Sequence, residues 1–542
     1  MTGAQILAKS LEKEGVELVF GYPGVAICPF YDALLETDIR GILVRSEQNA
    51  AHAANGYARV TGKVGCVAVT SGPGATNVIT GIATAFADSI PMVILTGQVQ
   101  KHLIGQDVFQ EADITGAAES FVKFSYQVRH ASDIPRIVKE AFYIGSSGRP
   151  GPVLIDLPID VQTENVSKVK EAEEVNLRTY KPTVQGNMAQ IKKVLKELGK
   201  AKSPILLVGG GVLRANAAPE VRAFAEKYQI PAVSTMMGIG VFPTEHPLYF
   251  GMVGNNGRPW ANKAMNKADL LVFVGARFAD RAISQPDLIT EGKVLVHIDV
   301  DPAEIGKTAG PTVPLVGDAK SIFGQLLSLE EEPSVQFAGW IDVLEVYRDG
   351  MKKNAPAKES KGISPAAFLR ELSDHMEPDA VYAADVGLNQ IWSCMNYEVK
   401  EGLFMTSGGM GTMGFALPAA FGARMGDPKR QVVSVMGDGG FQMAMPELAT
   451  LMQYGAEVKA VVLRNGTLGM VYEYQKHANA GRYTMVDISG APELSKIAEA
   501  YGIDYVKVDR GDDYGKLSEE FLKRPGTGLM EVIIDPEEGV KA

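Results

Sequence analysis

The chain has 542 residues, of which 46% are hydrophobic and 22% are charged, a composition typical of a globular protein with several domains. The net charge is −11 and no basic block occurs, which argues against nucleic acid and membrane partners. The longest uncharged apolar stretch, 75–87, is too short to span a bilayer. Three widely spaced cysteines and the absence of a signal-peptide pattern lead us to expect a cytoplasmic protein.

Short apolar, β-branched segments alternate with longer helical patterns along the whole chain. The first helix begins at a capping box, Thr2-Gly-Ala-Gln5. Uninterrupted apolar strands bounded by Gly, Ser and Asp are typical of parallel sheets covered by helices on both faces, so we expect an α/β fold with doubly wound parallel sheets. The expected strands are 16–20, 65–70, 91–96, 152–156, 205–208, 270–274, 294–298, 432–436, 458–463 and 529–534.

Two polar stretches divide the chain into parts of domain size. Residues 166–186 and 331–359 have the composition of linkers, although 340–347 shows helical periodicity. The remaining segments are predicted to be three domains, which cover residues 1–165, 187–330 and 360–542.

The strongest local motif is Gly437-Asp-Gly-Gly440, directly after the strand expected at 432–436. A glycine turn at the carboxyl end of a parallel strand lets backbone N–H groups approach a phosphate and sets a carboxylate beside it. Asn465 follows the next expected strand and would supply an amide oxygen. With a backbone carbonyl and diphosphate oxygens, these groups would complete a Mg²⁺ shell. Taken by itself, the tripeptide Gly-Asp-Gly could also be a tight turn that binds no ligand.

Further segments carry a resemblance that extends over all three expected domains, in the same order along the chain. The chain resembles the catalytic subunits of acetohydroxyacid synthases, which are thiamin-diphosphate enzymes. This resemblance implies thiamin diphosphate, Mg²⁺ and FAD as cofactors. The matching segments are GYPG at 21–24, RSEQNAAHAANGYAR at 45–59, TSGPGATN at 70–77, FQEADI at 109–114, GRPGPVLIDLP at 148–158, GARFADR at 275–281, HIDVDPAEIGK at 297–307 and TSGGMGTMGFALPAA at 406–420.

The resemblance also implies which residues hold the metal and the thiamin. Asp438, Asn465 and the carbonyl of Thr467 would bind Mg²⁺. The expected thiamin-diphosphate contacts are Pro73, Asn77, Val386, Gly387, Leu388, Asn389, Gly439, Gly440, Leu468, Gly469 and Met470. Leu388-Asn389 stands where the family commonly has Gln-His, which leaves the backbone contacts possible and puts the side-chain contacts in question.

Four residues are the expected catalytic set. Glu47 would hydrogen-bond the pyrimidine ring and favour its imino tautomer; from sequence alone, a helix-start carboxylate is the alternative. The Gly411 carbonyl would accept from the pyrimidine amine, and Met413 would bend the cofactor, although such a methionine is otherwise ordinary core. Gln110 would hydrogen-bond the substrate oxygen as charge develops.

The middle domain is expected to bind a flavin. Its segment 204–212 is a strand that runs into a Gly-rich turn, but it lacks the G-x-G-x-x-G pattern, so NAD binding is weakly supported. The resemblance implies a structural FAD, and a domain that has lost the flavin is the alternative. The expected contacts are Arg149, Gly209, Gly210, Thr235, Met236, Gly254, Arg277, Asp280, Arg281, Asp299, Glu304 and Asp318.

The substrate side is inferred from the resemblance as well. Phe109 would lie near the reacting carbon, and Arg277 would bind the carboxylate of the acceptor keto acid, unless it contacts only the flavin. Val471 and Tyr474 would line the acceptor pocket. Tyr474 stands where the family has a tryptophan, so acceptor choice is expected to differ.

The expected activity is that of an acetolactate synthase in the first common step of branched-chain amino acid biosynthesis. Pyruvate would be decarboxylated and condensed with a second 2-keto acid, pyruvate or 2-ketobutyrate. A pyruvate oxidase or 2-keto acid decarboxylase of the same fold is the main alternative, and a diphosphate-binding sensor on a retired enzyme fold is another. The resemblance implies a homodimer with active sites at the subunit interface. A tetramer and a small regulatory subunit are further possibilities.

Overall fold

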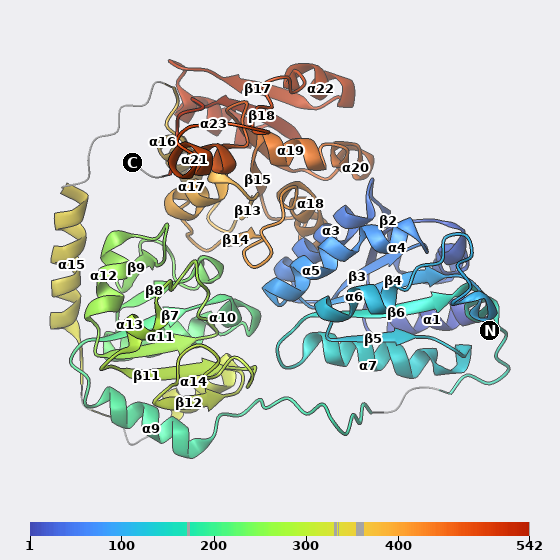
Figure 1. The fold of residues 1–542 in the computed structure, drawn as a ribbon, viewed down its shortest axis with the longest axis horizontal. Coiled ribbons are helices and arrows are strands. Elements are labelled where there is room, and N and C mark those ends of the chain that lie inside the picture. The colour runs from blue at the N-terminus through green and yellow to red at the C-terminus, as the bar shows by residue number, and fades with distance from the viewer. Residues whose placement is uncertain (171–173, 330–332, 334, 354–361, 541–542) are drawn as a thin grey trace.

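The computed structural model describes residues 1–542 apart from 171–173, 330–332, 334, 354–361 and 541–542 (Figure 1). The described residues form three six-stranded sheets, and all pairings between neighbouring strands are parallel. Helices cover the sheets, so the expected doubly wound α/β class is confirmed. Each of the three proposed domain ranges contains one sheet.

The first sheet lies between residues 18 and 158. Its helix α1 begins at the expected capping box, because Thr2 Oγ1 accepts from Gln5 N at 3.3 Å and Gln5 Oε1 accepts from Thr2 N at 2.9 Å. The elements are β1 (Leu18–Tyr22), β2 (Arg40–Leu43), β3 (Gly65–Val69), β4 (Met92–Gln98), β5 (Phe124–Gln127), β6 (Pro152–Pro158), α1 (Gly3–Lys13), α2 (Cys28–Ala33), α3 (Glu47–Thr61), α4 (Pro73–Asn77), α5 (Ile79–Asp88), α6 (Ile114–Ala118), α7 (Ile134–Ser146) and α8 (Ile159–Thr163).

The middle sheet contains the expected strands 205–208, 270–274 and 294–298 within one residue of their observed bounds. Its elements are β7 (Pro204–Val208), β8 (Ala232–Ser234), β9 (Tyr249–Met252), β10 (Leu270–Val274), β11 (Val294–Asp299), β12 (Val313–Val316), α9 (Met188–Leu198), α10 (Gly210–Arg214), α11 (Ala218–Tyr228), α12 (Pro259–Lys267), α13 (Pro286–Thr290), α14 (Ala319–Ser328) and α15 (Ala338–Lys353).

The third sheet completes the chain. Its elements are β13 (Val381–Ala384), β14 (Leu403–Thr406), β15 (Val432–Gly437), β16 (Lys459–Arg464), β17 (Asp504–Val508), β18 (Gly528–Ile533), α16 (Pro365–Asp374), α17 (Leu388–Asn396), α18 (Ala416–Gly426), α19 (Asp438–Ala444), α20 (Glu447–Tyr454), α21 (Gly469–Ala478), α22 (Leu494–Tyr501) and α23 (Tyr514–Lys523). Of the strands expected along the whole chain, the first differs most: β1 begins two residues later than expected and ends two residues later.

Strand order divides the sheets into two kinds. The first and third sheets have the same order, β2-β1-β3-β4-β6-β5 and β14-β13-β15-β16-β18-β17. The middle sheet has the order β12-β11-β10-β7-β8-β9, which is the 3-2-1-4-5-6 order of dinucleotide-binding folds read from its other edge. The two outer domains are therefore one fold used twice, and the middle domain is different.

Helices α3 and α18 join the first domain to the third. They are separated by more than 350 residues in sequence, and their small residues allow the backbones to touch, because a side chain at Gly56 or Gly422 would collide with the facing helix. Core residues of both domains form one continuous apolar cluster around this contact. The first and third domains therefore share one apolar core.

Helix α15 occupies much of the stretch with linker composition. Leu344 is buried against the middle domain, and Trp340 Nε1 donates to the carbonyl of Pro204 at 3.1 Å. The helical periodicity at 340–347 indicates this helix in the sequence, whereas the linker composition does not. Within the described residues, no helix is long and apolar enough to cross a bilayer.

Candidate active site

The third sheet reverses its strand order between β13 and β15. The chain turns away in opposite directions after these two neighbouring strands, so the loops at their carboxyl ends leave a crevice, where α/β proteins generally bind ligands. One side of this crevice is the turn after β13, residues 385–387. The other is Gly437–Gly440, which leads from β15 into α19.

Asp438 and Asn465 meet at the expected place, because β15 and β16 are neighbours. Asp438 Oδ1 accepts from Gly439 N at 3.1 Å, and Oδ2 accepts from Gly466 N at 2.8 Å. Asn465 Oδ1 accepts from Thr467 N at 3.0 Å. Burial raises the pKa of Asp438, although the backbone N–H groups oppose the shift, so a cation beside this carboxylate would relieve the cost of its charge.

The donor set fits Mg²⁺ better than a softer metal. Among the described residues, no cluster of three or more His, Cys, Asp or Glu side chains could hold a metal ion by itself. A cation at Asp438 would depend on amide and carbonyl oxygens and on oxygens from a ligand, which is typical of Mg²⁺ bound with a phosphate. Thr467 Oγ1 is buried here without a hydrogen-bond partner in the described structure, so the turn has an unsatisfied polar atom.

Three glycines line this crevice without room for side chains. A Cβ at Gly439 would lie 2.8 Å from Leu468 Cδ2 and 3.4 Å from Met413 Cε. A Cβ at Gly440 would lie 2.5 Å from Asp385 Oδ1, and one at Gly469 would lie 2.8 Å from Leu388 Cδ1. The structure thus brings together most of the residues predicted for the thiamin-diphosphate site, and glycines of this kind are typical of a turn whose backbone approaches a phosphate closely.

Asp385 organises the crevice, a role that sequence reasoning missed. Its Oδ1 accepts from Val386 N at 2.9 Å and Gly414 N at 3.0 Å, and Oδ2 accepts from Ala416 N at 2.9 Å. Complete burial raises the pKa of this carboxyl to about 6. An aspartate directly after an apolar strand, where polar groups are rarely buried unpaired, was the available signal.

Asn389 is held by the protein itself. Its Nδ2 donates to the carbonyls of Asp385 at 2.8 Å and Val435 at 3.2 Å. The amide nitrogen is therefore committed to the sheet, and a cofactor contact at this position would come from the backbone or from Oδ1, which lies beside the turns at Gly387 and Gly437. Gly387, with φ of 139°, lets the chain enter α17 beside it.

The first domain brings together the other predicted catalytic groups. Glu47 is the first residue of α3, and Asn77 Nδ2, at the end of α4, donates to its Oε2 at 3.1 Å. Pro73 begins α4. Gln110 has φ of 58° and packs on Gly72, where a Cβ would lie 2.9 Å from Gln110 Cβ.

Phe109 lies at the tip of the same loop with 87% of its surface exposed. Glu111 fastens this loop by accepting from the backbone N–H groups of Gly105 and Val108. The ring therefore makes little contact with the rest of the described structure.

Glu47 and Asp438 keep to separate domains in one chain. The contacts recorded for Glu47 lie within the first domain, and those recorded for Asp438 lie within the third. Figure 1 places α4 and α21 on opposite sides of the packed pair α3 and α18. The two carboxylates are therefore contributed by different domains of the chain.

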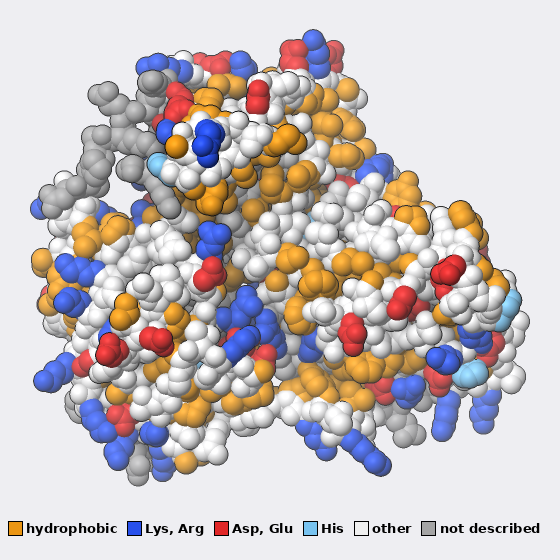
Figure 2. Space-filling model, in the orientation of Figure 1, with side chains coloured by type: hydrophobic (Ala, Val, Ile, Leu, Met, Phe, Trp, Pro, Cys, Tyr) orange, Lys and Arg blue, Asp and Glu red, His pale blue; other side chains and the backbone are white. Residues whose placement is uncertain are grey.

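A cavity of about 1100 Å³ opens where the three domains meet, and Figure 2 shows basic side chains gathered in the hollow between the middle and first domains. It lies beside the switch point of the middle sheet, where Gly209 N donates to Val274 O at 2.9 Å. Gly209 and Gly254 lie beside the cavity in the backbone turns. The other predicted flavin contacts line it: Arg149, Gly210, Thr235, Met236, Arg277, Asp280, Arg281, Asp299, Glu304 and Asp318.

The charges around this cavity suit a dinucleotide. Burial raises the pKa of Asp299, at the end of β11, to about 6, so this carboxyl would gain from a hydroxyl donor such as a ribose. Arg149 reaches across from the first domain, and its Nη1 lies 3.0 Å from Glu304 Oε1. Arg277 donates to the carbonyl of Ala87 at 3.3 Å. These arginines would face a diphosphate.

The predicted acceptor-side residues stand on α21. Val471 is 46% exposed and Tyr474 is 67% exposed, while Met470 of the same helix lines the large cavity. Val386 and Gly411 line that cavity as well. The helix therefore presents its predicted substrate residues outward.

Comparison with known proteins agrees with this architecture. Family models described as the thiamine pyrophosphate enzyme N-terminal TPP binding domain, central domain and C-terminal TPP binding domain match residues 1–117, 191–326 and 385–532. The chain is 41% identical to the acetolactate synthase large subunit of Lactococcus lactis subsp. lactis, across 99% of this chain and 93% of that protein. The large subunit of Haemophilus influenzae is also 41% identical, across 100% and 96%. An acetolactate synthase of Arthrospira platensis is 42% identical, across 99% and 95%. With matching domains in all three sheets and full-length similarity of this extent, the chain belongs to the thiamine pyrophosphate enzyme family, among the relatives of acetolactate synthase large subunits.

Proposed function

We propose that this protein is an acetolactate synthase, which decarboxylates pyruvate and joins the remaining two-carbon unit to a second 2-keto acid. The observation that carries the proposal is the oxygen-donor pair Asp438 and Asn465 at the switch point of the third sheet, in a chain similar to acetolactate synthases over its full length. The products would be 2-acetolactate from two pyruvates and 2-aceto-2-hydroxybutyrate when 2-ketobutyrate is the acceptor.

Thiamin diphosphate, when bound, supplies an electron sink for the pair of electrons left by decarboxylation. The residues of the chain bind and orient the reactants. Asp438, Asn465 and the Thr467 carbonyl would hold Mg²⁺ against the diphosphate. Glu47, fastened by Asn77, would hold a proton at the pyrimidine nitrogen. Gln110 would donate a hydrogen bond to the substrate oxygen.

The separation of Glu47 from Asp438 supports a homodimer as the smallest active unit. Each site would take Glu47 from one subunit and Asp438 from the other, and the exposed Phe109 would extend toward the neighbouring subunit. Mixing an inactive Glu47 variant with an inactive Asp438 variant tests this arrangement. Partial recovery of activity on subunit exchange is expected, and no recovery after verified exchange would contradict a shared site.

A product assay tests the activity itself. Purified protein is incubated with pyruvate, thiamin diphosphate and Mg²⁺, with and without FAD, and the products are identified. Acetolactate is the expected product. Acetaldehyde alone, or acetyl phosphate with peroxide when phosphate and oxygen are present, would instead identify a decarboxylase or an oxidase.

FAD is the proposed occupant of the large cavity. We expect FAD to raise the midpoint of thermal unfolding, because a ligand at about a hundredfold excess over its Kd stabilises the native state by about 2.7 kcal/mol. Riboflavin, which lacks the diphosphate and the second nucleotide, should have a much smaller effect, since it has no groups to contact the arginines and Asp299. Equal shifts from both ligands, or none from FAD, would contradict a dinucleotide site.

Acceptor choice is expected to depend on Tyr474. A methylene in an apolar pocket is worth only ~1–3 kcal/mol, or about 10–200-fold in selectivity. Tyr474 presents less apolar surface than a tryptophan, and its hydroxyl needs a partner or water. Tyr474→Trp should therefore raise the ratio of acetohydroxybutyrate to acetolactate when pyruvate and 2-ketobutyrate compete. Tyr474→Phe separates the hydroxyl from ring size, and an unchanged ratio in Tyr474→Trp would place Tyr474 outside the pocket.

A further inference from the structure

The segment between β14 and α18, residues 407–414, which we call the glycine loop, carries Gly411 and Met413. Four of its eight residues are glycine, and Gly411 and Gly414 have φ of 70° and 81°. Glycine-rich backbone outside helices and strands has little intrinsic preference for one conformation. The position of the loop must therefore depend on its hydrogen bonds and packing rather than on backbone preference.

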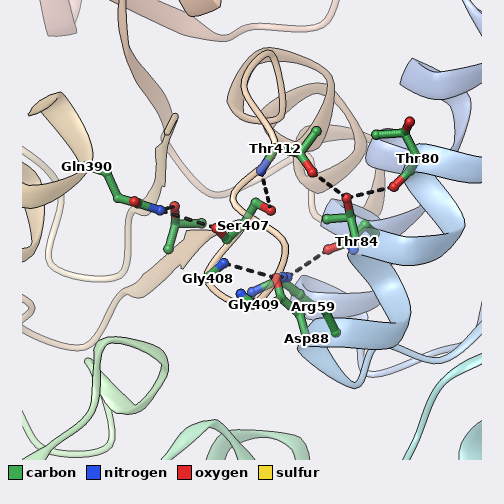
Figure 3. A network of polar contacts seen from close by, with 12 residues as sticks. Arg59, Thr80, Thr84, Asp88, Gln390, Ser407, Gly408, Gly409 and Thr412 are labelled. Atoms are coloured by element: carbon green, nitrogen blue, oxygen red, sulfur yellow. Dashed lines mark hydrogen bonds and ion pairs between the residues drawn. The ribbon is translucent and has the colours of Figure 1, made fainter. Parts of the chain in front are cut away.

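One partner in these hydrogen bonds is Asp88, the last residue of α5 in the first domain (Figure 3). Its Oδ1 accepts from Gly409 N at 2.7 Å, and its Oδ2 lies 3.4 Å from Gly408 N. Its side chain is fully buried, a costly place for a lone carboxylate. Arg59 Nη2 lies 2.7 Å from Asp88 Oδ2 and compensates the charge of the carboxylate. Arg59 is held in turn by Asn55, whose Oδ1 accepts from Arg59 Nε at 2.8 Å.

Thr84, one turn earlier on α5, holds the far end of the loop. Its hydroxyl lies 2.7 Å from the Thr412 hydroxyl and donates to the Thr80 carbonyl at 2.8 Å. The Thr412 N–H in turn donates to Ser407 Oγ at 3.0 Å, which closes the loop on itself. Asp88 and Thr84 thus lie along one face of the helix and engage both ends of the loop (Figure 3).

The loop is also too closely packed to move without breaking these bonds. A Cβ at Gly409 would lie 2.8 Å from Ala87 Cβ, and one at Gly408 would overlap the Met237 sulfur of the middle domain. On the other side, the backbone N–H of Gly414 is held by Asp385 at 3.0 Å. Met413 therefore sits between two anchored points, Thr412 and Gly414.

We propose that Asp88, neutralised by Arg59, and Thr84 are positioning residues that hold Gly411 and Met413 in register with the cofactor site. The inference rests on the proposed function for the role of Met413. In this arrangement the first domain does more than supply Glu47, because it also sets the shape of the glycine loop in the third domain of its own chain. None of these residues is required to touch the substrate.

The test compares Thr84→Val with Thr61→Val. Both variants remove a hydroxyl that donates to the carbonyl one turn earlier at 2.8 Å and makes a second hydrogen bond, but Thr61 lies at the end of α3. Without cofactor, Thr84→Val should speed amide hydrogen exchange of residues 407–414 by roughly five- to tenfold, as expected for one lost hydrogen bond. Thr61→Val should leave that exchange unchanged, and Thr84→Ser should restore it.

A second measurement concerns the bound cofactor. The rate at which added thiamin diphosphate exchanges its C2 proton should fall on the order of 10–100-fold in Thr84→Val, because small misplacements of reacting groups are costly. The kcat for pyruvate should fall in parallel, with KM nearly unchanged. Asp88→Asn should also lower the C2 exchange rate and kcat. If Asp88→Asn does not fold, Thr84→Val alone tests the proposal.

Unchanged loop exchange in Thr84→Val, or an equal loss of C2 exchange in Thr61→Val, would overturn the proposal. Loop exchange needs neither substrate nor cofactor, and C2 exchange needs no acceptor. A wild-type protein that makes no acetolactate would therefore refute the proposed function without deciding the fate of this positioning role.

Discussion

Glu47→Gln is expected to leave thiamin-diphosphate binding nearly intact and to lower turnover ~10²–10⁴-fold, the usual contribution of an acid/base group. Glutamine keeps the size of the side chain and can still accept from Asn77, but it cannot exchange a proton with the pyrimidine ring. The measurement combines kcat for pyruvate with a titration of the cofactor.

Glu12→Gln serves as the matched control. Glu12 is an exposed carboxylate of the same domain that likewise accepts one hydrogen bond, from Asp38 N at 2.9 Å. It should retain full activity. A Glu47→Gln enzyme that keeps more than about a third of the wild-type rate would contradict the assignment. A loss of about threefold is far smaller than the ~10²–10⁴-fold loss expected for an acid/base group.

Asp438→Ala should remove the dependence of thiamin-diphosphate affinity on Mg²⁺. Outer-shell changes alone cost about 10–100-fold in metal affinity, so loss of a direct ligand should cost at least as much. The diphosphate would then face the buried end of β15 without a cation to neutralise it. Calorimetric titration of the cofactor with and without Mg²⁺ measures both affinities.

Asp438 also fastens its turn, and a control must separate that role from metal binding. Asp513→Ala removes a comparable carboxylate, since Asp513 Oδ1 accepts from Lys516 N at 3.1 Å at the start of α23. Both variants should lose stability on the scale of ~0.5–2 kcal/mol for a helix-start hydrogen bond. Only Asp438→Ala should lose Mg²⁺ dependence; if it binds the cofactor as wild type does, Gly437–Gly440 is only a turn.

Local sequence determined the elements and part of the site. Uninterrupted apolar strands can be buried only in covered parallel sheets, and this physical constraint was enough for the α/β class. The proximity of Asp438 to Asn465 was also predictable, because consecutive strands of such a sheet end at the same edge. The order of the strands along the chain and the Gly-Asp-Gly motif were together enough to predict these two oxygen donors.

Tertiary structure decided which distant residues support them. The shared strand order of the first and third sheets leaves no short-period repeat in the sequence, because topology depends on connections rather than on residue identity. The direction of the Asn389 side chain, into the sheet, depends on carbonyls that only the assembled strands present. The local sequence pattern carries no information about the shared strand order or about the direction of the Asn389 side chain.

The glycine loop shows the same division most clearly. Its composition indicates freedom from helix and strand, and its place beside a cofactor site follows from the resemblance. Its hydrogen bonds to Asp88 cross 320 and 321 residues of chain, and they exist only because α3 and α18 bring the first and third domains together. The sequence by itself determined which strands, helices and loops form; contacts between side chains far apart in the chain, and hence the rigidity of the site, depend on how those elements pack.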